Sequence, residues 1–228
     1  MRYAAILGIL AMAFVSLPAM AGVVPQAAPA GELNMYEIYN NLYGTGFASN
    51  AELDVMRVAN METWLMPSSA MGWVEARVAY NYIEAEFGYY TPAGVVDGEE
   101  LLFTIPAPNS GDLSGLTATF DIEDSFGLYL HPLDPTGAPS GTWYSETALN
   151  NVPQDHLVVY RTPDPMNPTV LLAWEDLQLG DPNSHNDYND VVIELSWRCE
   201  NTVVPEPATM VLLGLGLAGV AVRRFAFV

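Results

Sequence analysis

A series of short strand-like runs between residues 74 and 197 constrains the fold of this chain more than any other feature. The runs are rich in Val, Ile, Leu and aromatic residues, and clusters of Gly, Pro, Asn and Asp separate them. No helical segment alternates with the runs, which argues against a parallel α/β sheet. The pattern instead predicts a mainly β domain, an antiparallel β-sandwich or jelly-roll-like fold. The seven runs are Val74–Tyr80, Leu101–Ile105, Leu116–Ile122, Gly127–Leu130, Leu157–Arg161, Val170–Trp174 and Val191–Trp197.

Two helix-start signals precede these runs. Asn34 stands before an apolar stripe with helical spacing, which predicts a short helix from this residue. Ser49, with Glu52 three residues later, forms a capping box and predicts a second, brief helix through about Met56. The predicted domain therefore covers residues 34–198 and begins with short helices. The apolar stripe consists of Met35, Ile38, Tyr39 and Leu42.

The first 33 residues do not belong to the predicted domain. A positive start at Arg2, a long apolar run and a break at Pro18 precede the small residues Ala19 and Ala21. This order is typical of a signal peptide over residues 1–21, which signal peptidase removes after Ala21. Residues 22–33 are rich in Ala and Pro and predict a disordered lead-in.

The C-terminal end has a second processing signal. Pro205, Glu206 and Pro207 precede an apolar segment, residues 208–222, and the pair Arg223 and Arg224 follows it. As a helix this segment spans only about 22 Å, and a membrane span needs about 20 residues, so a buried core helix is an alternative. Against that alternative, the segment has no polar face. The arginine pair favours an outside-to-inside orientation in a membrane.

This tail, residues 205–228 after a linker at 199–204, resembles the PEP-CTERM sorting signal of Gram-negative bacteria. The resemblance implies cleavage near the tripeptide by an exosortase and a transient stay in the inner membrane through residues 208–222. It also implies localisation at the outer surface or in the extracellular matrix, in an organism that makes exopolysaccharide. Within the tail, Gly214, Gly216 and Gly219 match a dinucleotide-binding pattern, but the chain ends where the following acidic residue is required. We reject that interpretation.

The charge of the chain excludes one class of partner. Without both processing segments, 26 acidic residues stand against four arginines, and the chain contains no lysine. So acidic a surface repels phosphate backbones, which excludes nucleic acid as a partner. It suits divalent cations, or solubility outside the cell. Cys199 is the only cysteine, so no internal disulfide can form.

The densest polar cluster lies between residues 174 and 192. Hard cations such as Ca²⁺ take six to eight oxygen ligands from carboxylates, amides and carbonyls. Two acidic stretches at neighbouring strand ends can supply such ligands, although the spacing is not that of an EF-hand. The alternative is a hairpin whose side chains cap their own turns. The predicted calcium ligands are Glu175, Asp176, Asp181, Asn183, Asp187, Asn189 and Asp190.

The stretch LLAWEDLQLGDPNSHNDYNDVVIEL resembles the C-terminal signature of domain of unknown function 4114, found in bacterial surface and secreted proteins. Glu175, Asp176, Asp187, Asn189 and Asp190 occupy its recurring positions, whereas His185 and Asn186 stand where that family more often has acids. With the upstream phrases FGLYLHP, WYSE and QDHLVVYR, the resemblance covers about residues 100–198. It implies a place in the envelope and no particular activity.

Enzymatic chemistry has weaker support in the sequence. Glycosidase carboxylates are conceivable at Glu84 and Glu86, or at Asp121, Glu123 and Asp124, but solvated acids are the simpler interpretation in so acidic a chain. The three histidines, His131, His156 and His185, are scattered and lack zinc-site spacing. Five tryptophans are candidates for a sugar-binding face, although core packing is the default in a sandwich. They are Trp64, Trp73, Trp143, Trp174 and Trp197.

The sequence therefore predicts a non-catalytic, secreted envelope or matrix protein that an exosortase sorts and that a calcium ion stabilises. The alternative is a carbohydrate-binding module for exopolysaccharide, and a polysaccharide-active enzyme ranks third.

Overall fold

The computed structural model describes most of the region between the two processing segments. The described residues are 24–65, 70–96, 98–108, 111–113, 115–122, 124–134, 136–138, 140–151, 154–164, 169–178 and 184–199. The predicted signal peptide, its cleavage site at Ala19 and Ala21, and the tail from Pro205 to Arg224 lie outside them. Among the described residues, none of the helices has the length and apolar character of a membrane span.

Both predicted N-terminal helices are present. Helix α1 (Met35–Tyr43) begins after Asn34, whose backbone N–H donates to the Glu37 carboxylate over 2.8 Å. It ends at Gly44, which adopts a left-handed conformation that glycine accepts without steric cost. Ser49 caps α2 (Asn50–Leu53), and the 3₁₀ helix η1 (Asp54–Met56) continues it.

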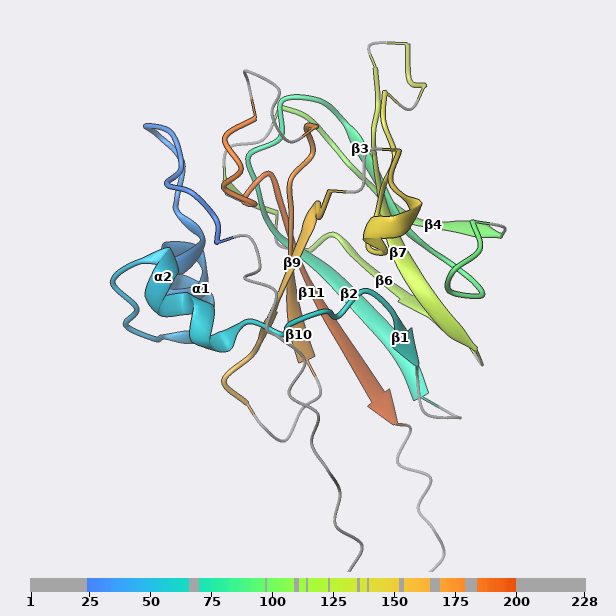
Figure 1. Cartoon of the computed structure of the whole chain (residues 1–228), viewed down its shortest axis with the longest axis horizontal. Coiled ribbons are helices and arrows are strands. Elements are labelled where there is room, and N and C mark those ends of the chain that lie inside the picture. The colour runs from blue at the N-terminus through green and yellow to red at the C-terminus, as the bar shows by residue number, and fades with distance from the viewer. Residues whose placement is uncertain are drawn as a thin grey trace, which may run out of the picture.

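One antiparallel sheet contains the last strand of the domain at its centre. Its order is β5-β2-β11-β10-β9, and β6 also pairs with β2. Figure 1 shows β2, β9, β10 and β11 side by side. The strands are β2 (Ala70–Ala79), β5 (Gly111–Asp112), β6 (Thr117–Phe120), β9 (Leu157–Arg161), β10 (Thr169–Trp174) and β11 (Val191–Cys199).

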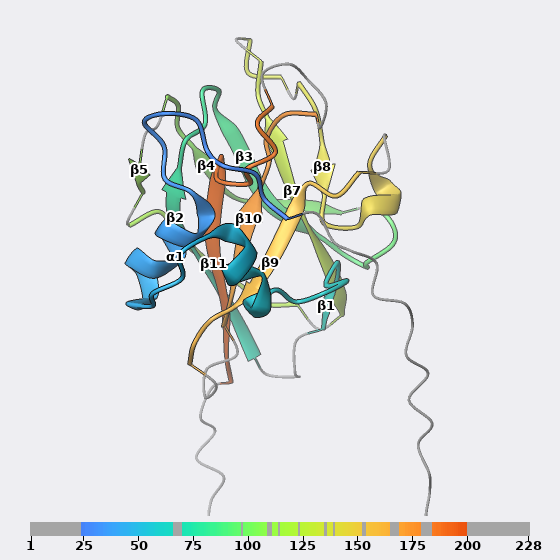
Figure 2. The same cartoon turned by 60° about the vertical axis from the view of Figure 1, so that its left-hand side comes forward.

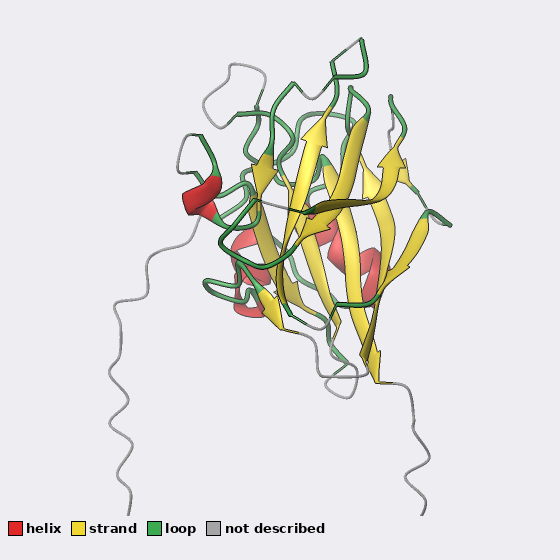
Figure 3. Cartoon of the chain, turned by 90° about the vertical axis from the view of Figure 1, so that its right-hand side faces the viewer, coloured by secondary structure: helices red, strands yellow, loops and turns green. Residues whose placement is uncertain are grey.

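The second antiparallel sheet packs against the first and completes a β-sandwich (Figure 3). Its order is β1-β7-β3-β4, and β8 also pairs with β7. A short 3₁₀ helix, η2 (Thr147–Leu149), follows β8. The strands are β1 (Trp64–Leu65), β3 (Ala85–Tyr90), β4 (Glu99–Ile105), β7 (Ser125–Pro132) and β8 (Trp143–Tyr144).

The main core lies between the two sheets because the inward residues of both are apolar. On β11, Val191, Ile193 and Leu195 point into this core, as the alternation of the sequence predicts. Aromatic rings fill much of the remaining volume, and the rings of Phe87 and Trp174 meet edge to face at 6.3 Å. The predicted antiparallel sandwich is confirmed.

A second core covers the outer face of the first sheet. Helix α1 lies across this face (Figure 2) and buries Met35, Ile38 and Tyr39 against it. The Tyr39 hydroxyl donates to the Arg161 carbonyl over 2.6 Å. Val192 is therefore fully buried although it points away from the sandwich core, and β11 is covered on both faces at its first residues.

The strands and the N-terminal segment both differ from the expectation. Strand β3 and the two-residue strands β1, β5 and β8 are absent from the predicted runs, and in β3 the residues Glu86 and Gly88 interrupt the apolar pattern. Residues 24–33 have no helix or strand, as the composition indicates, but several of them are hydrogen bonded to the domain rather than disordered. The Gln26 N–H donates to the Asn186 carbonyl over 2.9 Å, and the Asn50 side chain donates to the carbonyls of Pro25 and Gln26.

Candidate divalent-cation site

The register of two neighbouring strands brings the acidic stretches together. Trp174, the last residue of β10, pairs with Val191, the first residue of β11. Glu175 and Asp176 therefore follow β10 at the same end of the sheet at which Asp190 precedes β11. A one-residue shift of this register would send every side chain of β11 to the other face, so the buried apolar residues of β11 also position its acidic end.

Three carboxylates converge at this end of the sheet. One carboxylate oxygen from each of Glu175, Asp176 and Asp190 lies within 4.8 Å of the other two. The Asp176 N–H donates to an Asp190 carboxylate oxygen over 3.0 Å. The Ser184 hydroxyl donates to the Glu175 carboxylate over 2.9 Å. Two oxygens bound to one Ca²⁺ at about 2.4 Å lie at most about 4.8 Å apart, so this spacing fits a shared ion.

Burial makes the cluster costly without a counter-ion. Glu175 and Asp176 are 1% and 5% exposed. Burial raises the pKa of Asp176 to about 7, and the Glu175 charge adds to this rise. Burial likewise raises the pKa of Glu175 and of Asp190. Since each buried ion costs on the order of several kcal/mol, the cluster needs either protons or a cation.

The loop before β11 turns further polar groups inward. Asn186 and Tyr188 both have a left-handed backbone, with φ of 52° and 58°, which is uncommon for residues other than glycine. Burial of the Tyr188 ring and a 2.6 Å hydrogen bond from its hydroxyl to the Asp155 carbonyl hold this conformation. As a result, Asp187 and Asn189 are also buried.

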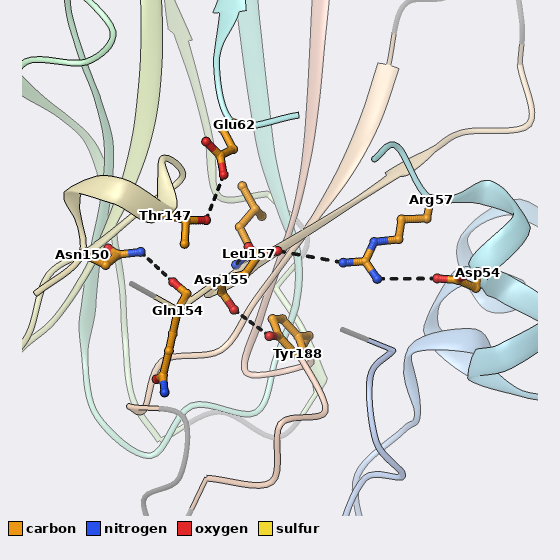
Figure 4. A network of polar contacts seen from close by, with 9 residues as sticks. All are labelled: Asp54, Arg57, Glu62, Thr147, Asn150, Gln154, Asp155, Leu157 and Tyr188. Carbon is orange, nitrogen blue, oxygen red and sulfur yellow. Dashed lines mark hydrogen bonds and ion pairs between the residues drawn. The ribbon is translucent and has the colours of Figure 1, made fainter. Parts of the chain in front are cut away.

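A polar network anchors that tyrosine to the rest of the domain (Figure 4). The Asp155 carbonyl accepts the hydrogen bond from Tyr188, and the Asp155 carboxylate lies 3.9 Å from the guanidinium of Arg57. Arg57 in turn lies 3.6 Å from Asp54 of η1. Burial raises the pKa of Asp155, and Arg57 partly opposes this. The loop that carries the acids is thus attached to the helical segment on the outer face.

Of the seven predicted ligands, the structure brings three within binding distance of one another. Asp187 is 1% exposed, and burial, followed by the Glu175 charge, raises its pKa to about 6. The Asn189 amide N–H₂ donates to the Leu33 carbonyl over 2.9 Å and to Glu32. Asp181 and Asn183 lie outside the described residues.

The donor atoms fit a divalent cation. Within the described part of the chain, Glu175 Oε2, Asp187 Oδ2 and Asn189 Oδ1 are buried oxygens without a hydrogen-bond partner. Among the ion pairs of these described residues, none reaches Glu175, Asp176 or Asp190. Glu175, Asp176 and Asp190 would hold the ion, and the set of oxygen ligands suits Ca²⁺.

Two further residues at the site were not among the predicted ligands. The Trp143 indole N–H donates to the Asp176 carbonyl over 2.7 Å. His156 Nδ1 lies 3.2 Å from the Glu175 carbonyl, and the two rings stack with centroids 3.9 Å apart. No local pattern marks these residues, because both are distant from the acidic stretches in sequence.

The remaining candidate residues are dispersed over the domain. Trp64 and Trp174 are core residues, and Trp143 and Trp197 pack against the same core, so these four do not form an exposed sugar-binding face. His131 is buried on β7, and His185 is exposed. Glu86 on β3 pairs with His131. The other proposed glycosidase acids lie at exposed or partly exposed loop positions, Glu84, Asp121 and Asp124, and Glu123 lies outside the described residues.

One open cavity of about 480 Å³ is lined by residues outside the acidic cluster. The loop before β3, with Tyr82 and Glu84, and the loop after β7, with Asp134, line it. The Tyr82 side chain is 76% exposed, which makes it the most exposed large aromatic side chain among the described residues.

Comparison with known proteins identifies the C-terminal tail. The family described as PEP-CTERM protein-sorting motif matches residues 203–224. No curated protein matches the chain. Similar solved structures include the high-affinity mannose-binding lectin of Ralstonia solanacearum, with 18% identity, a TM-score of 0.37, and coverage of 61% of this chain and 98% of the lectin. The C-terminal domain of the BC2L-C lectin from Burkholderia cenocepacia has 16% identity, a TM-score of 0.37, and coverage of 60% and 95%.

The tail match confirms the predicted sorting motif. It indicates that the chain is exported and sorted to the envelope or the extracellular side of a Gram-negative bacterium. The two lectins are too distant to support a statement about ligands. The resemblance to domain of unknown function 4114 stays a prediction.

Proposed function

We propose that this chain is a non-catalytic surface or matrix protein that an exosortase sorts and whose β-sandwich domain a bound Ca²⁺ stabilises. The ion would link the ends of β10 and β11 through Glu175, Asp176 and Asp190. Its role would be structural, because the ligands join strand ends that belong to the core of the domain.

One observation carries the calcium part of this proposal. Three carboxylates converge within 4.8 Å, two of them almost fully buried, and Glu175 Oε2 has no hydrogen-bond partner among the described residues. Desolvated carboxylates at this spacing repel one another strongly unless a positive charge lies between them. A cation removes that repulsion and uses the unpartnered oxygen.

The ligand atoms favour Ca²⁺ over other divalent ions. Mg²⁺ requires a near-ideal octahedron and keeps several waters, whereas Ca²⁺ accepts an irregular set of carboxylate and carbonyl oxygens. Zn²⁺ prefers nitrogen and sulfur ligands. The converging groups at this edge are all carboxylates.

The calcium proposal is tested by thermal unfolding of the full chain in mild detergent. With Ca²⁺ at about 1 mM, the concentration range of extracellular calcium modules, the melting temperature should exceed that in chelator by several degrees. Mg²⁺ at the same concentration should give a smaller increase. A melting temperature that does not respond to Ca²⁺ at pH 7 contradicts the proposal.

The sorting proposal needs a separate test in the producing cell. Glu206→Ala should leave the protein unprocessed in the membrane fraction, whereas wild type should be released or transferred to the surface. Glu200→Ala, a matched change in the adjoining linker, should be processed as wild type is. Normal processing of Glu206→Ala would falsify the role of the tripeptide.

Carbohydrate binding remains the alternative, and the cavity beside Tyr82 is the place to look for it. An exposed aromatic ring with neighbouring carboxylates, Glu84 and Asp134, suits stacking and hydrogen bonding to a sugar. A glycan array with wild type and Tyr82→Ala tests this alternative. Binding that Tyr82→Ala abolishes would favour it, and an array without binding would remove it.

A further inference from the structure

The cation site includes a stacked pair of rings that binds the backbone of two ligand residues. Trp143 on β8 and His156 before β9 stack with an interplanar angle of 7°. The Trp143 N–H donates to the carbonyl of Asp176, and His156 Nδ1 contacts the carbonyl of Glu175. Each of the two stacked rings therefore contacts one of two consecutive peptide carbonyls, that of Glu175 or that of Asp176.

The contact with the Glu175 carbonyl fixes the tautomer of His156. A carbonyl oxygen only accepts hydrogen bonds, so the proton of the neutral ring lies on Nδ1. His156 is fully buried, and its Nε2 has no hydrogen-bond partner among the described residues.

The strand ladder alone does not hold this part of the chain. The pairing of β9 with β10 ends at Leu157 and Trp174, and one further backbone bond joins the Glu175 N–H to the His156 carbonyl over 3.0 Å. Beyond Trp174, Glu175 and Asp176 do not belong to a strand. Trp143 belongs to the opposite sheet, so its bond to Asp176 connects the site to both layers of the sandwich.

We propose that Trp143 and His156 are positioning residues of the cation site, and that Trp143 reports the occupancy of this site. The inference rests on the proposed calcium site. By holding the peptide carbonyls of Glu175 and Asp176, the two rings fix the backbone from which both carboxylate side chains extend. Loss of one such bond should therefore weaken cation binding before it affects the fold.

Calcium titration of the full chain in mild detergent tests the role of the tryptophan. Trp143→Phe retains a ring that can stack on His156 and removes the N–H donor. Loss of one hydrogen bond should weaken Ca²⁺ affinity by about 5- to 10-fold. Trp197→Phe, a matched change at the far end of β11, should bind Ca²⁺ as wild type does.

Fluorescence provides a readout that a merely structural role does not change. Ca²⁺ should alter the tryptophan emission of wild type and of Trp197→Phe, and most of this change should be absent in Trp143→Phe. An unchanged affinity of Trp143→Phe, even with a lower melting temperature, overturns the proposal. So does a calcium-dependent emission change that persists without Trp143.

The histidine is tested by rescue. His156→Leu removes the donor and should weaken Ca²⁺ affinity at least as much as Trp143→Phe. His156→Asn, whose amide nitrogen can take the place of Nδ1, should recover most of that loss. Equal affinities of the two variants overturn the role of His156, and if His156→Leu does not fold, Trp143→Phe still decides. If wild type itself binds no Ca²⁺, the proposed function fails instead.

Discussion

Asp190 belongs to the acidic cluster through both its backbone neighbour and its carboxylate. It accepts a hydrogen bond from the Asp176 backbone, and one of its oxygens lies within 4.8 Å of oxygens of Glu175 and Asp176. Its pKa is raised by burial and then by the charges of Asp176 and Glu175. The strength of the cation site and the instability of the metal-free domain therefore depend on the same side chain.

Asp190→Asn should separate these two effects. The change removes one negative charge, so in chelator the melting temperature should rise by about 3 °C, equivalent to about 1 kcal/mol of relieved repulsion. The stabilisation by Ca²⁺ should be mostly lost, because one charged ligand is missing. Differential scanning calorimetry in chelator and in Ca²⁺ measures both.

Glu100→Gln is the control for that experiment. It removes one negative charge at an exposed position on β4 and should leave the calcium response at the wild-type value. Equal calcium responses of Asp190→Asn and wild type would argue against Asp190 as a ligand.

His131 should contribute to the acid sensitivity of the domain. Burial lowers its pKa in the folded state, although Glu99 on β4, 3.7 Å away, and Glu86 on β3 oppose this. The rings of Tyr129 and Tyr144 also face it. The unfolded chain therefore takes up a proton near pH 6.5 that the folded state resists. The contribution is present above pH 6.5 and is lost as the pH falls toward the lower folded value.

His131→Gln should make the free energy of unfolding less dependent on pH between about 7 and 5, by on the order of 1 kcal/mol. Urea unfolding in chelator at several pH values measures this difference. Parallel pH profiles for wild type and His131→Gln would contradict the prediction.

At the scale of elements, close cross-strand packing positions β3 between its two neighbours. A Cβ atom at Gly88 would collide with the Glu100 carbonyl of β4 and with the ring of Tyr129 on β7. A glycine here lets the tyrosine ring lie across the strand, and a Cβ atom would force the backbones of β3 and β4 apart. The same glycine interrupts the apolar pattern by which a strand is recognised in the sequence.

Gly88→Ala should destabilise the domain by about 2–3 kcal/mol, in the upper range for overpacking, and lower the melting temperature by about 5–10 °C. Gly46→Ala is the matched control, because a Cβ atom there meets nothing within 4 Å. Thermal unfolding by circular dichroism compares the two. Equal melting temperatures would show that the strands separate at low cost.

At the scale of the whole molecule, the excess of acids over arginines makes charge repulsion a general property. Three of the arginines are engaged locally: Arg57 with Asp54 and Asp155, Arg77 with Glu75, and Arg161 with the Val55 carbonyl. They leave most of the acidic surface uncompensated. Such self-repulsion destabilises a compact state and is screened by salt.

Raising NaCl from about 0.01 M to about 1 M shortens the Debye length from about 30 Å to about 3 Å. In chelator, the melting temperature should increase by several degrees, about 2–4 °C per kcal/mol of relieved repulsion. With saturating Ca²⁺ the increase should be smaller. Choline chloride should act as NaCl does, and a response confined to sodium would indicate ion binding rather than screening.

The sequence alone predicts the β-sandwich architecture and the sorting signal of this protein. The alternation of Val191, Ile193 and Leu195 predicts a strand with one core face, because residues at period two share a face of a sheet. Asn34 and Ser49 mark both helix starts, because capping is local. The tail from Pro205 to Arg224 is read from residue order alone, and so is the acidic composition of residues 175–190.

Only the tertiary structure selects which acids meet. The register between Trp174 and Val191 brings Glu175, Asp176 and Asp190 together, and the buried Tyr188 turns the loop between them. The tertiary structure also places Trp143 and His156 next to the backbone of Glu175 and Asp176, and it covers the outer face of β11 with α1. These contacts join residues from distant parts of the chain and depend on packing between layers, which no local pattern of residues encodes.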